Sequence, residues 1–291
     1  MNNSNKTVSN IVTWIRFNLL NYYPDNEIQN FIYLIFEHLL NYTKIDIHIK
    51  SNEIISRRVE KQIYEIVNDL KNNKPIQYIF KKTEFYGLPF RVSANTMIPR
   101  QETEELVGWI IKDNQDNKSK YTILDIGTGC GCIAIVLARN LTYCSIEALD
   151  ISKKAINMAK TNAKMNNASV RFFRYDILKY ETKKVKRNYD IIVSNPPYIL
   201  ESEKFTMPGN VLYYEPHKAL FVPDNDPLVF YRAIAKFGLQ NLKCKGILYL
   251  EINEALAKQV AEELVKHNYG NIIIGKDING KDRIVKASKA H

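Results

Sequence analysis

The chain has 291 residues, of which 45% are hydrophobic and 25% are charged. This length and composition are typical of a globular protein of about two domains. No stretch approaches the ~20 apolar residues of a membrane-spanning helix, so we expect no membrane association. Residues 1–6 lack the apolar core of a secretory signal, so we expect a cytoplasmic protein.

The formal net charge is +10, with +2 in residues 1–85 and +8 in residues 86–291. A basic balance can indicate a nucleic-acid partner. The lysines are scattered along the chain, however, and the densest basic run, residues 179–187, falls in a predicted loop. We therefore interpret the excess charge as solvated surface and do not expect nucleic acid as a partner.

The four cysteines are Cys130, Cys132, Cys144 and Cys244. Their spacing fits neither a zinc site nor a Cys-x-x-Cys redox pair. Cys130 and Cys132 lie in a glycine-rich turn, where small side chains are required. We expect all four to be reduced and structural, and we expect no metal site.

Residues 1–75 are predicted to form a small bundle of three amphipathic helices. Apolar residues recur at helical spacing over residues 7–22, and again over residues 27–42 after a candidate cap at Asp25. Ser51 opens the third predicted helix. Residues 76–98 follow as a β-hairpin linker, because two apolar runs flank Gly87-Leu88-Pro89.

Residues 99–291 alternate between strands and helices, beginning with an acidic helix after Pro99. The predicted strands are residues 123–126, 145–150, 170–175, 189–194 and 246–252, and the predicted helices are 133–140, 153–166, 226–241 and 255–267. Asn279-Gly280 joins two closing strands as a hairpin. Residues 199–225 are long and irregular, which is typical of a binding segment. The alternation predicts an α/β fold with a mainly parallel sheet and helices on both faces.

A glycine-rich loop, Gly127-Thr128-Gly129-Cys130-Gly131, follows the first of these strands. Such a loop lets the backbone approach a ligand closely, but the further glycine of a dinucleotide site is replaced by Cys132. Asp125 precedes the loop and could orient an ammonium group. Asp150 and Asp176 end the next two strands, where they could accept ribose hydroxyls and an adenine amino group. Each aspartate alone is more often a cap or turn residue.

The tetrapeptide Asn195-Pro196-Pro197-Tyr198 ends the strand at residues 189–194. Two prolines stop a strand, and the residue before a proline is held extended. The tetrapeptide therefore presents a short amide, stiff carbonyls and an aromatic ring at the ligand-binding edge of the sheet. This set suits a planar nitrogen group, although the tetrapeptide alone could be a strand-terminating turn.

The order and spacing of these motifs resemble class I methyltransferases that bind S-adenosylmethionine, over about residues 100–288. The tetrapeptide is similar to that of methyltransferases acting on planar amide or exocyclic amino nitrogens. Further segments resemble the release factor glutamine methyltransferases over nearly the whole chain. These segments are Gln77-Tyr78-Ile79, Glu84-Phe85-Tyr86-Gly87, Ile98-Pro99-Arg100-Gln101-Glu102-Thr103-Glu104, Glu215-Pro216 with Ala219-Leu220, and Gly280-x-Asp282-Arg283.

This resemblance implies a Rossmann-like sheet, mostly parallel with an antiparallel last strand, in residues 99–291. It also implies that the helical bundle recognises substrate. The cofactor would be S-adenosylmethionine, and the substrate the glutamine of the Gly-Gly-Gln motif in class I peptide chain release factors. The implied cofactor-binding residues are Asp125, Gly127, Thr128, Gly129, Cys130, Gly131, Asp150, Asp176, Ile177 and Asn195. We expect the protein to be a monomer.

An amide nitrogen is a poor nucleophile, so the enzyme must orient it. We expect the Asn195 side-chain oxygen and the Pro196 carbonyl to accept its two N–H bonds, with alignment supplying most of the rate. Pro197 would stiffen the turn and Tyr198 would pack on the amide. The cofactor supplies an activated methyl group.

Two other functions remain open from the residues themselves. A nucleic-acid adenine or cytosine amino-methyltransferase could use the same tetrapeptide, with Tyr198 stacking on a flipped base. A non-catalytic module that binds adenosyl compounds would not need the tetrapeptide. The chain also departs from the family, which often has Gly at Lys81 and at Asn253, Pro at Gln101, and glycines in residues 222–227. We expect these departures to alter local loop geometry.

Overall fold

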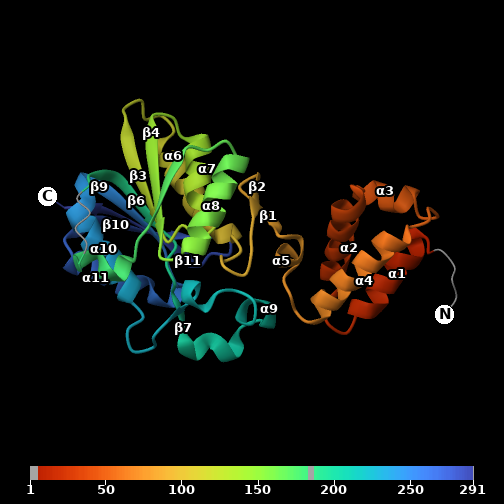
Figure 1. Cartoon of the computed structure of the whole chain (residues 1–291). Helices are drawn as coiled ribbons and strands as arrows, with labels where there is room; N and C mark the ends of the chain where they lie inside the picture. Colours follow the sequence, from red (N-terminus) through yellow and green to blue (C-terminus); the bar gives the residue numbers. More distant parts are fainter. Residues whose placement is uncertain (1–5, 183–186, 291) are drawn as a thin grey trace. The chain divides into compact units, whose positions relative to one another are not determined.

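The computed structural model describes residues 6–182 and 187–290. The chain divides into two compact units, which are treated separately below (Figure 1). The helical unit contains residues 1–81 and 209–214, and the sheet unit contains residues 82–208 and 215–291. Residues 183–186 of the predicted basic loop lie outside the described residues. In the described part of the chain, no helix is both long and apolar enough to cross a membrane.

The helical unit contains more helices than the three predicted. They are α1 (Val8–Leu19), α2 (Asp25–Leu40), α3 (Lys44–Ile49), α4 (Arg57–Lys71), α5 (Ile76–Phe80) and α9 (Gly209–Leu212). Short α3 arises from a capping box, in which the Thr43 hydroxyl accepts the Asp46 N–H at 3.1 Å and the Asp46 carboxylate accepts the Thr43 N–H at 2.9 Å.

Two predicted helix starts were wrong. Asp25 lies in the first turn of α2 rather than at its cap, which is Pro24. The third predicted helix begins at Arg57 rather than at Ser51, because the Ser56 side chain accepts the Val59 N–H at 3.4 Å. The stretch that precedes it includes Ile54, which forms an antiparallel bridge with Thr7.

The helical unit has a hydrophobic core of its own. The apolar spacing that predicted the helices places one stripe of each long helix inside this core. The members with no exposed surface are Ile11, Ile15, Leu19, Ile28, Ile32, Ile35, Phe36 and Ile63. The segment 209–214 joins the unit from far along the chain, and the Tyr214 hydroxyl donates to the Asn72 carbonyl at 2.7 Å.

The sheet unit is built on seven strands in the order β10-β11-β9-β6-β3-β4-β5. Their bounds are β3 (Tyr121–Ile126), β4 (Cys144–Asp150), β5 (Val170–Arg174), β6 (Tyr189–Ser194), β9 (Leu242–Glu251), β10 (Tyr269–Lys276) and β11 (Asp282–Lys289). All neighbours are parallel except β11, which is antiparallel to both β9 and β10. The predicted sheet, mostly parallel with an antiparallel last strand, is confirmed.

Helices cover both faces of this sheet (Figure 1). One group is α6 (Gln101–Asn114), α7 (Cys132–Asn140) and α8 (Lys153–Met165), and the other is α10 (Val229–Asn241) with α11 (Ala257–Lys266). Short 3₁₀ turns are η1 (Ile177–Thr182), η2 (Glu201–Thr206), η3 (His217–Ala219) and η4 (Glu254–Leu256). The long segment after the tetrapeptide is held by a small parallel pair, β7 (Ile199–Leu200) with β8 (Phe221–Val222).

The predicted hairpin is present as β1 (Lys82–Phe85) and β2 (Leu88–Arg91), and it belongs to the sheet unit. Asn162 of α8 connects this hairpin to the glycine loop. Its amide exchanges two hydrogen bonds with the Arg91 backbone, at 2.8 and 2.9 Å, and donates to the Cys130 carbonyl at 2.9 Å. The hairpin therefore helps to fix the loop that follows β3.

Two of the family departures have a structural reason. Lys81 ends α5 with φ +56°, a left-handed conformation that glycine adopts more readily. Gln101 is the first residue of α6, where proline is favoured because the first N–H of a helix has no intrahelical acceptor. At both positions the residue present is less suited to the local backbone conformation than the glycine or proline that the family often has.

Candidate active site

The site lies where the strand order reverses. The chain runs outward from β3 through β4 to β5, and then returns to place β6 on the other side of β3. Ligands in open α/β sheets bind at this switch point, outside the carboxyl ends of the strands. The register pairs Ile126 with both Leu149 and Ser194, so Gly127, Asp150 and Asn195 emerge at the same level.

The glycine loop after β3 adopts backbone conformations that favour glycine. The φ angles of Gly127, Gly129 and Gly131 are +75°, +57° and +90°. A Cβ on Gly127 would lie 3.8 Å from the Asn195 carbonyl oxygen, so this loop and the tetrapeptide lie next to each other. Cys130 is buried within the loop and is a free thiol.

Asp125 is a buried carboxylate with one oxygen left for a ligand. Its Oδ2 accepts the Thr128 hydroxyl at 2.6 Å, whereas Oδ1 is buried without a hydrogen-bond partner among the described residues. Burial raises the pKa of Asp125 to about 7, and the nearby Asp150 adds to this shift. An orphaned buried acceptor at a strand end suits a cationic group such as an ammonium.

Asp150 ends β4 and is held by two backbone N–H groups. Ser152 donates to Oδ1 at 2.8 Å and Gly129 donates to Oδ2 at 2.9 Å. Burial raises the pKa of Asp150 against the effect of these hydrogen bonds. A carboxylate has about four acceptor positions, so two remain for a pair of hydroxyl groups. The expected ribose contact therefore fits the arrangement.

Asp176 and Ile177 lie one strand further along the same edge. The Tyr175 N–H donates to the Asp150 carbonyl at 3.0 Å, which brings the end of β5 beside that of β4. The Asp176 carboxylate accepts the Leu178 N–H at 3.1 Å, and Ile177 is buried. An adenine that extends from a ribose at Asp150 would thus reach a carboxylate and an apolar side chain.

The tetrapeptide leaves β6 beside the glycine loop. Ser194, just before it, donates its hydroxyl hydrogen to the Ile126 carbonyl at 2.7 Å. Asn195 donates through Nδ2 to the Thr103 hydroxyl oxygen at 3.0 Å. Pro196 is buried, whereas Asn195, Pro197 and Tyr198 are partly exposed.

Two buried residues that sequence patterns did not single out contact the tetrapeptide. Thr103 of α6 donates its hydroxyl to Glu251 Oε2 at 2.7 Å, and Tyr198 donates its hydroxyl to Glu251 Oε1 at 3.1 Å. Glu251 lies at the end of β9, and burial raises its pKa to about 7. A carboxylate that ends an apolar strand, as in Leu248-Tyr249-Leu250-Glu251, was the available signal for it.

Asn253, one of the family departures, also supports the tetrapeptide. Its Nδ2 donates to the Tyr198 carbonyl at 3.2 Å, and its Oδ1 accepts the Ala255 N–H at 3.0 Å to cap η4. The backbone N–H of Asn253 donates to the Tyr231 hydroxyl at 3.3 Å. Asn253 therefore ties the end of β9 to the carboxyl end of the tetrapeptide.

An ion pair fixes the end of the long segment that follows the tetrapeptide. The Arg100 guanidinium, just before α6, pairs with the buried carboxylate of Glu215. The same carboxylate accepts the Ile98 N–H at 3.3 Å, and burial raises its pKa. These contacts hold residue 215 against the segment that precedes α6.

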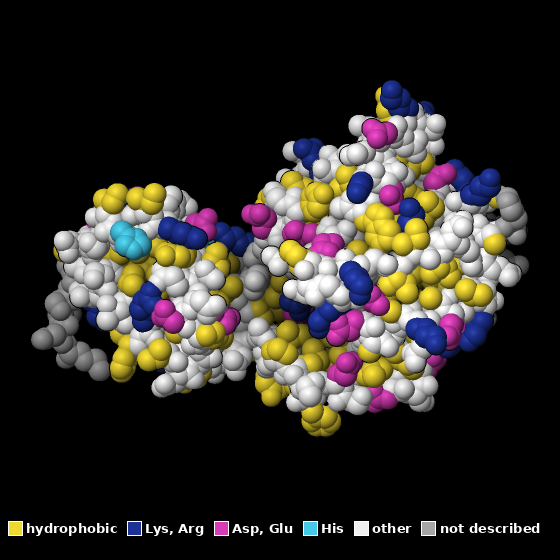
Figure 2. All heavy atoms as spheres, turned by 180° about the vertical axis from the view of Figure 1, so that it is seen from behind, with side chains coloured by type: hydrophobic (Ala, Val, Ile, Leu, Met, Phe, Trp, Pro, Cys, Tyr) yellow, Lys and Arg dark blue, Asp and Glu magenta, His cyan; other side chains and the backbone are white. Residues whose placement is uncertain are grey.

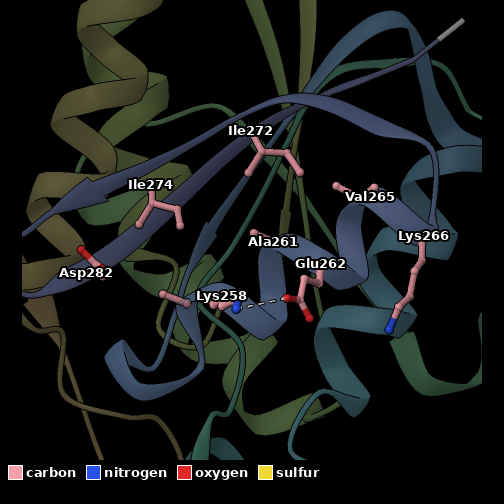
Figure 3. Close-up of a pocket in the computed structure, with 9 residues that line it drawn as sticks. Lys258, Ala261, Glu262, Val265, Lys266, Ile272, Ile274 and Asp282 are labelled. Carbon is pink, nitrogen blue, oxygen red and sulfur yellow. Dashed lines mark ion pairs between the residues drawn. The ribbon is translucent and has the colours of Figure 1, made fainter.

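The groove outlined in Figure 3 lies elsewhere, between α11 and β10. Ile272 and Ile274 point from β10 toward α11, where Lys258 and Glu262 form an ion pair at 3.9 Å. None of the residues that line the groove belongs to the strand-end site.

This sheet, its glycine loop and the acidic strand ends define a class I S-adenosylmethionine-dependent methyltransferase, and the free Asp125 oxygen fits the ammonium group of that cofactor. A family model for the methyltransferase small domain matches residues 109–215. A model for the PrmC N-terminal domain matches residues 11–80.

The release factor glutamine methyltransferase of Flavobacterium psychrophilum is 45% identical over 272 residues, which cover 93% of this chain and 95% of the relative. That of Bacteroides thetaiotaomicron is 42% identical over 282 residues, which cover 97% of this chain and 100% of the relative. The chain therefore belongs to the release factor glutamine methyltransferases.

Solved structures show the likeness of fold alone. A methyltransferase from Pyrococcus furiosus aligns with a TM-score of 0.51 at 17% identity, covering 81% of this chain and all of that one. The hMettl16 catalytic domain, in complex with MAT2A 3'UTR hairpin 6, aligns with a TM-score of 0.55 at 15% identity, covering 93% of this chain and 94% of that one.

Proposed function

We propose that this enzyme methylates the side-chain amide nitrogen of the glutamine in the Gly-Gly-Gln motif of class I peptide chain release factors. The observation that carries the proposal is the orientation of Asn195. Its Nδ2 is engaged by Thr103, so Oδ1 is left to accept a hydrogen bond. With the Pro196 carbonyl as a second acceptor, Asn195 would match the two N–H bonds of a primary amide.

The residues of the chain act mainly by orientation. Asn195 Oδ1 and the Pro196 carbonyl accept the two N–H bonds and hold the amide plane. Alignment of reacting groups in this way can account for several kcal/mol of the barrier. Asp125, Asp150 and the glycine loop hold S-adenosylmethionine, which supplies an activated methyl group when bound. As the nitrogen–carbon bond forms, the carbon–sulfur bond breaks and the nitrogen releases one proton.

Tyr198 would contribute a rigid wall beside the amide. Its hydroxyl is held by Glu251 and its carbonyl by Asn253, so the ring has little freedom to turn away. Pro197 fixes the backbone between these contacts and Asn195. This arrangement supports the roles expected of the tetrapeptide.

We further propose that the helical unit recognises the release factor outside its glutamine. The separate hydrophobic core of that unit and its match to the family's N-terminal domain support this role. We also propose that the enzyme acts as a monomer. Action on release factors implies a cytoplasmic enzyme.

The direct test is mass spectrometry of a release factor incubated with the enzyme and S-adenosylmethionine. We expect a gain of one methyl group on the Gly-Gly-Gln glutamine. The Asn195→Ala variant should lose turnover by about 100-fold, because the amide is no longer aligned, while it still binds S-adenosylhomocysteine. Near-normal turnover by this variant would contradict the assignment of Asn195.

A parallel arm offers the enzyme DNA and ribosomal RNA with labelled cofactor. On the face drawn in Figure 2, Lys and Arg side chains are interspersed with Asp and Glu rather than gathered into a stripe. This distribution does not favour a nucleic-acid track. Methylation of nucleic acid in preference to release factor would overturn the proposed substrate.

A further inference from the structure

Two linked hydrogen bonds connect Asn195 to two buried residues of the sheet unit. Asn195 Nδ2 donates to Thr103 Oγ1 at 3.0 Å, and the Thr103 hydroxyl donates to Glu251 Oε2 at 2.7 Å. The relative exposures of Thr103 and Glu251 are 2% and 1%. These three residues come from the end of β6, from α6 and from the end of β9, so the contacts depend on the folded sheet unit.

The carboxylate of Glu251 decides in which direction these hydrogen bonds donate. An ionised carboxylate can only accept hydrogen bonds, so the single hydrogen of the Thr103 hydroxyl must point to Glu251. The Thr103 oxygen is then an acceptor, and only the Nδ2 side of the Asn195 amide can satisfy it. Asn195 Oδ1 is therefore turned away from Thr103.

We infer that Thr103 and Glu251 are positioning residues that hold the Asn195 amide with its oxygen toward the substrate nitrogen. This inference rests on the proposed function, since it concerns the group that receives the substrate amide. A substrate amide needs an acceptor at this point. If the Asn195 amide were turned over, its own N–H groups would meet those of the substrate.

Protonation of Glu251 would remove the constraint. A carboxylic acid carries a hydrogen that it can donate to Thr103, and Thr103 could then donate to Asn195 Oδ1. The asparagine would present N–H groups to the substrate, which is the wrong polarity. The orientation of Asn195 therefore depends on the charge of Glu251.

The groups around Glu251 place this change near neutral pH. Burial raises the pKa of Glu251 to about 7, and the Glu102 charge on α6 also raises it. The hydrogen bonds from Thr103 and Tyr198 and the charge of Arg283 on β11 oppose the rise. The Tyr231 hydroxyl of α10 and the Asp277 carboxylate, which pairs with Arg283, are further titratable groups in these surroundings.

The first test removes the Thr103 hydroxyl at nearly constant volume. With Thr103→Val, Asn195 Nδ2 loses its acceptor, and we expect kcat for release-factor methylation to fall about 10- to 100-fold because the amide is misaligned. Thr103→Ser restores the hydroxyl and should recover most of that loss. Thr161→Val removes an exposed hydroxyl on α8 and should match the wild type.

Binding of S-adenosylhomocysteine, measured by calorimetry, separates alignment from folding. We expect its affinity to be unchanged in Thr103→Val, because neither Thr103 nor Glu251 belongs to the glycine loop or to the strands that end in Asp150 and Arg174 beside the expected cofactor. A Thr103→Val enzyme with wild-type kcat would overturn the inference. Absence of methylation by the wild-type enzyme would instead overturn the proposed function.

The second test uses the pH profile of kcat at saturating cofactor. We expect the wild-type kcat to fall as the pH decreases through about 7, because protonated Glu251 no longer fixes Asn195. Glu251→Gln cannot titrate, and its amide oxygen can accept from Thr103 at every pH, so this fall should be absent. If Glu251→Gln keeps the same acid limb, the inference is wrong, even where Thr103→Val fails to fold.

Discussion

Asp125 combines a cost in stability with a role in binding. Its carboxylate is fully buried, and Oδ1 has no hydrogen-bond partner among the described residues. A charged group left in this state destabilises the unbound protein. The same oxygen can bind a cationic group, so binding of such a ligand would offset the stability that the buried charge costs.

We therefore expect Asp125→Asn to stabilise the unbound enzyme above pH 7. The pKa of Asp125 is about 7 in the folded protein, against an ordinary value of 3.8, so the folded state binds more protons between these pH values. The free energy of unfolding of the wild type then falls as the pH rises through this window. The variant avoids this loss and should gain about 1–3 kcal/mol at pH 8 and a smaller amount at pH 5, where only part of the window has been crossed.

Urea denaturation at the two pH values measures this difference, and calorimetry measures cofactor affinity. We expect the variant to bind S-adenosylhomocysteine about 10- to 100-fold more weakly, because an amide replaces a charged partner of the ammonium. An equal gain in stability at both pH values would show that burial of the charge is not its cause.

For single residues, sequence patterns identified the site residues at strand ends but missed the buried residues that hold the tetrapeptide in place. Asp125 and Asp150 follow from their places at the carboxyl ends of apolar strands. Thr103 and Glu251 contact each other across 148 positions, a pairing that no local pattern contains. Their function depends on which strand ends and helices the folded sheet brings together.

Among the elements, the glycine loop is closely constrained by packing. Gly131 has φ +90°, and a Cβ there would lie 2.9 Å from Ile135 Cδ1 and 3.0 Å from Ala159 Cβ. Ile135 belongs to α7 and Ala159 to α8. The loop is thus pressed against two helices, which keeps its backbone in place for the cofactor.

Gly131→Ala should therefore combine backbone strain with a clash. We expect a loss of about 2–4 kcal/mol in the free energy of unfolding, from the left-handed conformation and from overpacking. Gly87→Ala is a matched control, because Gly87 has φ +71° and a Cβ there would meet nothing within 4 Å. It should lose only about 1 kcal/mol. Equal losses in the two variants would exclude the clash as a cause.

Helices and strands with long apolar patterns were predictable, and short ones were not. The strand at residues 189–194 was predicted with its observed bounds, because prolines end it sharply. Helices α3, α5 and α9 were missed, since four to six residues are too few to show a helical period. A capping box starts α3, whereas α5 has no side-chain cap.

At the scale of the whole molecule, the chain passes three times between two separate cores. It leaves the helical unit after residue 81, returns for residues 209–214 and leaves again before Glu215. In sequence, the returning segment follows the tetrapeptide and directly precedes Glu215, the residue that pairs with Arg100. Sequence patterns gave no indication of this return, because its only signal is a distant contact such as that of Tyr214 with Asn72.

Two separate cores allow substrate recognition to be tested apart from chemistry. Ile32 in α2 and Ile192 in β6 are both fully buried, one in each unit. Ile32→Ala should destabilise the helical unit by about 2–5 kcal/mol through the cavity it leaves, without changing the strand-end site. If the helical unit binds the release factor, kcat/KM for the intact factor should fall about tenfold or more above the melting temperature of that unit in the variant, where about a tenth of it or less is folded.

A Gly-Gly-Gln peptide provides the contrast, because it is too short to contact a second recognition surface. We expect Ile32→Ala to methylate the peptide as fast as the wild type does and to bind S-adenosylhomocysteine equally well. Ile192→Ala should impair both substrates, because its cavity lies in the strand that carries Asn195. If Ile32→Ala affects the peptide and the intact factor equally, the helical unit supports the sheet unit rather than binding the substrate.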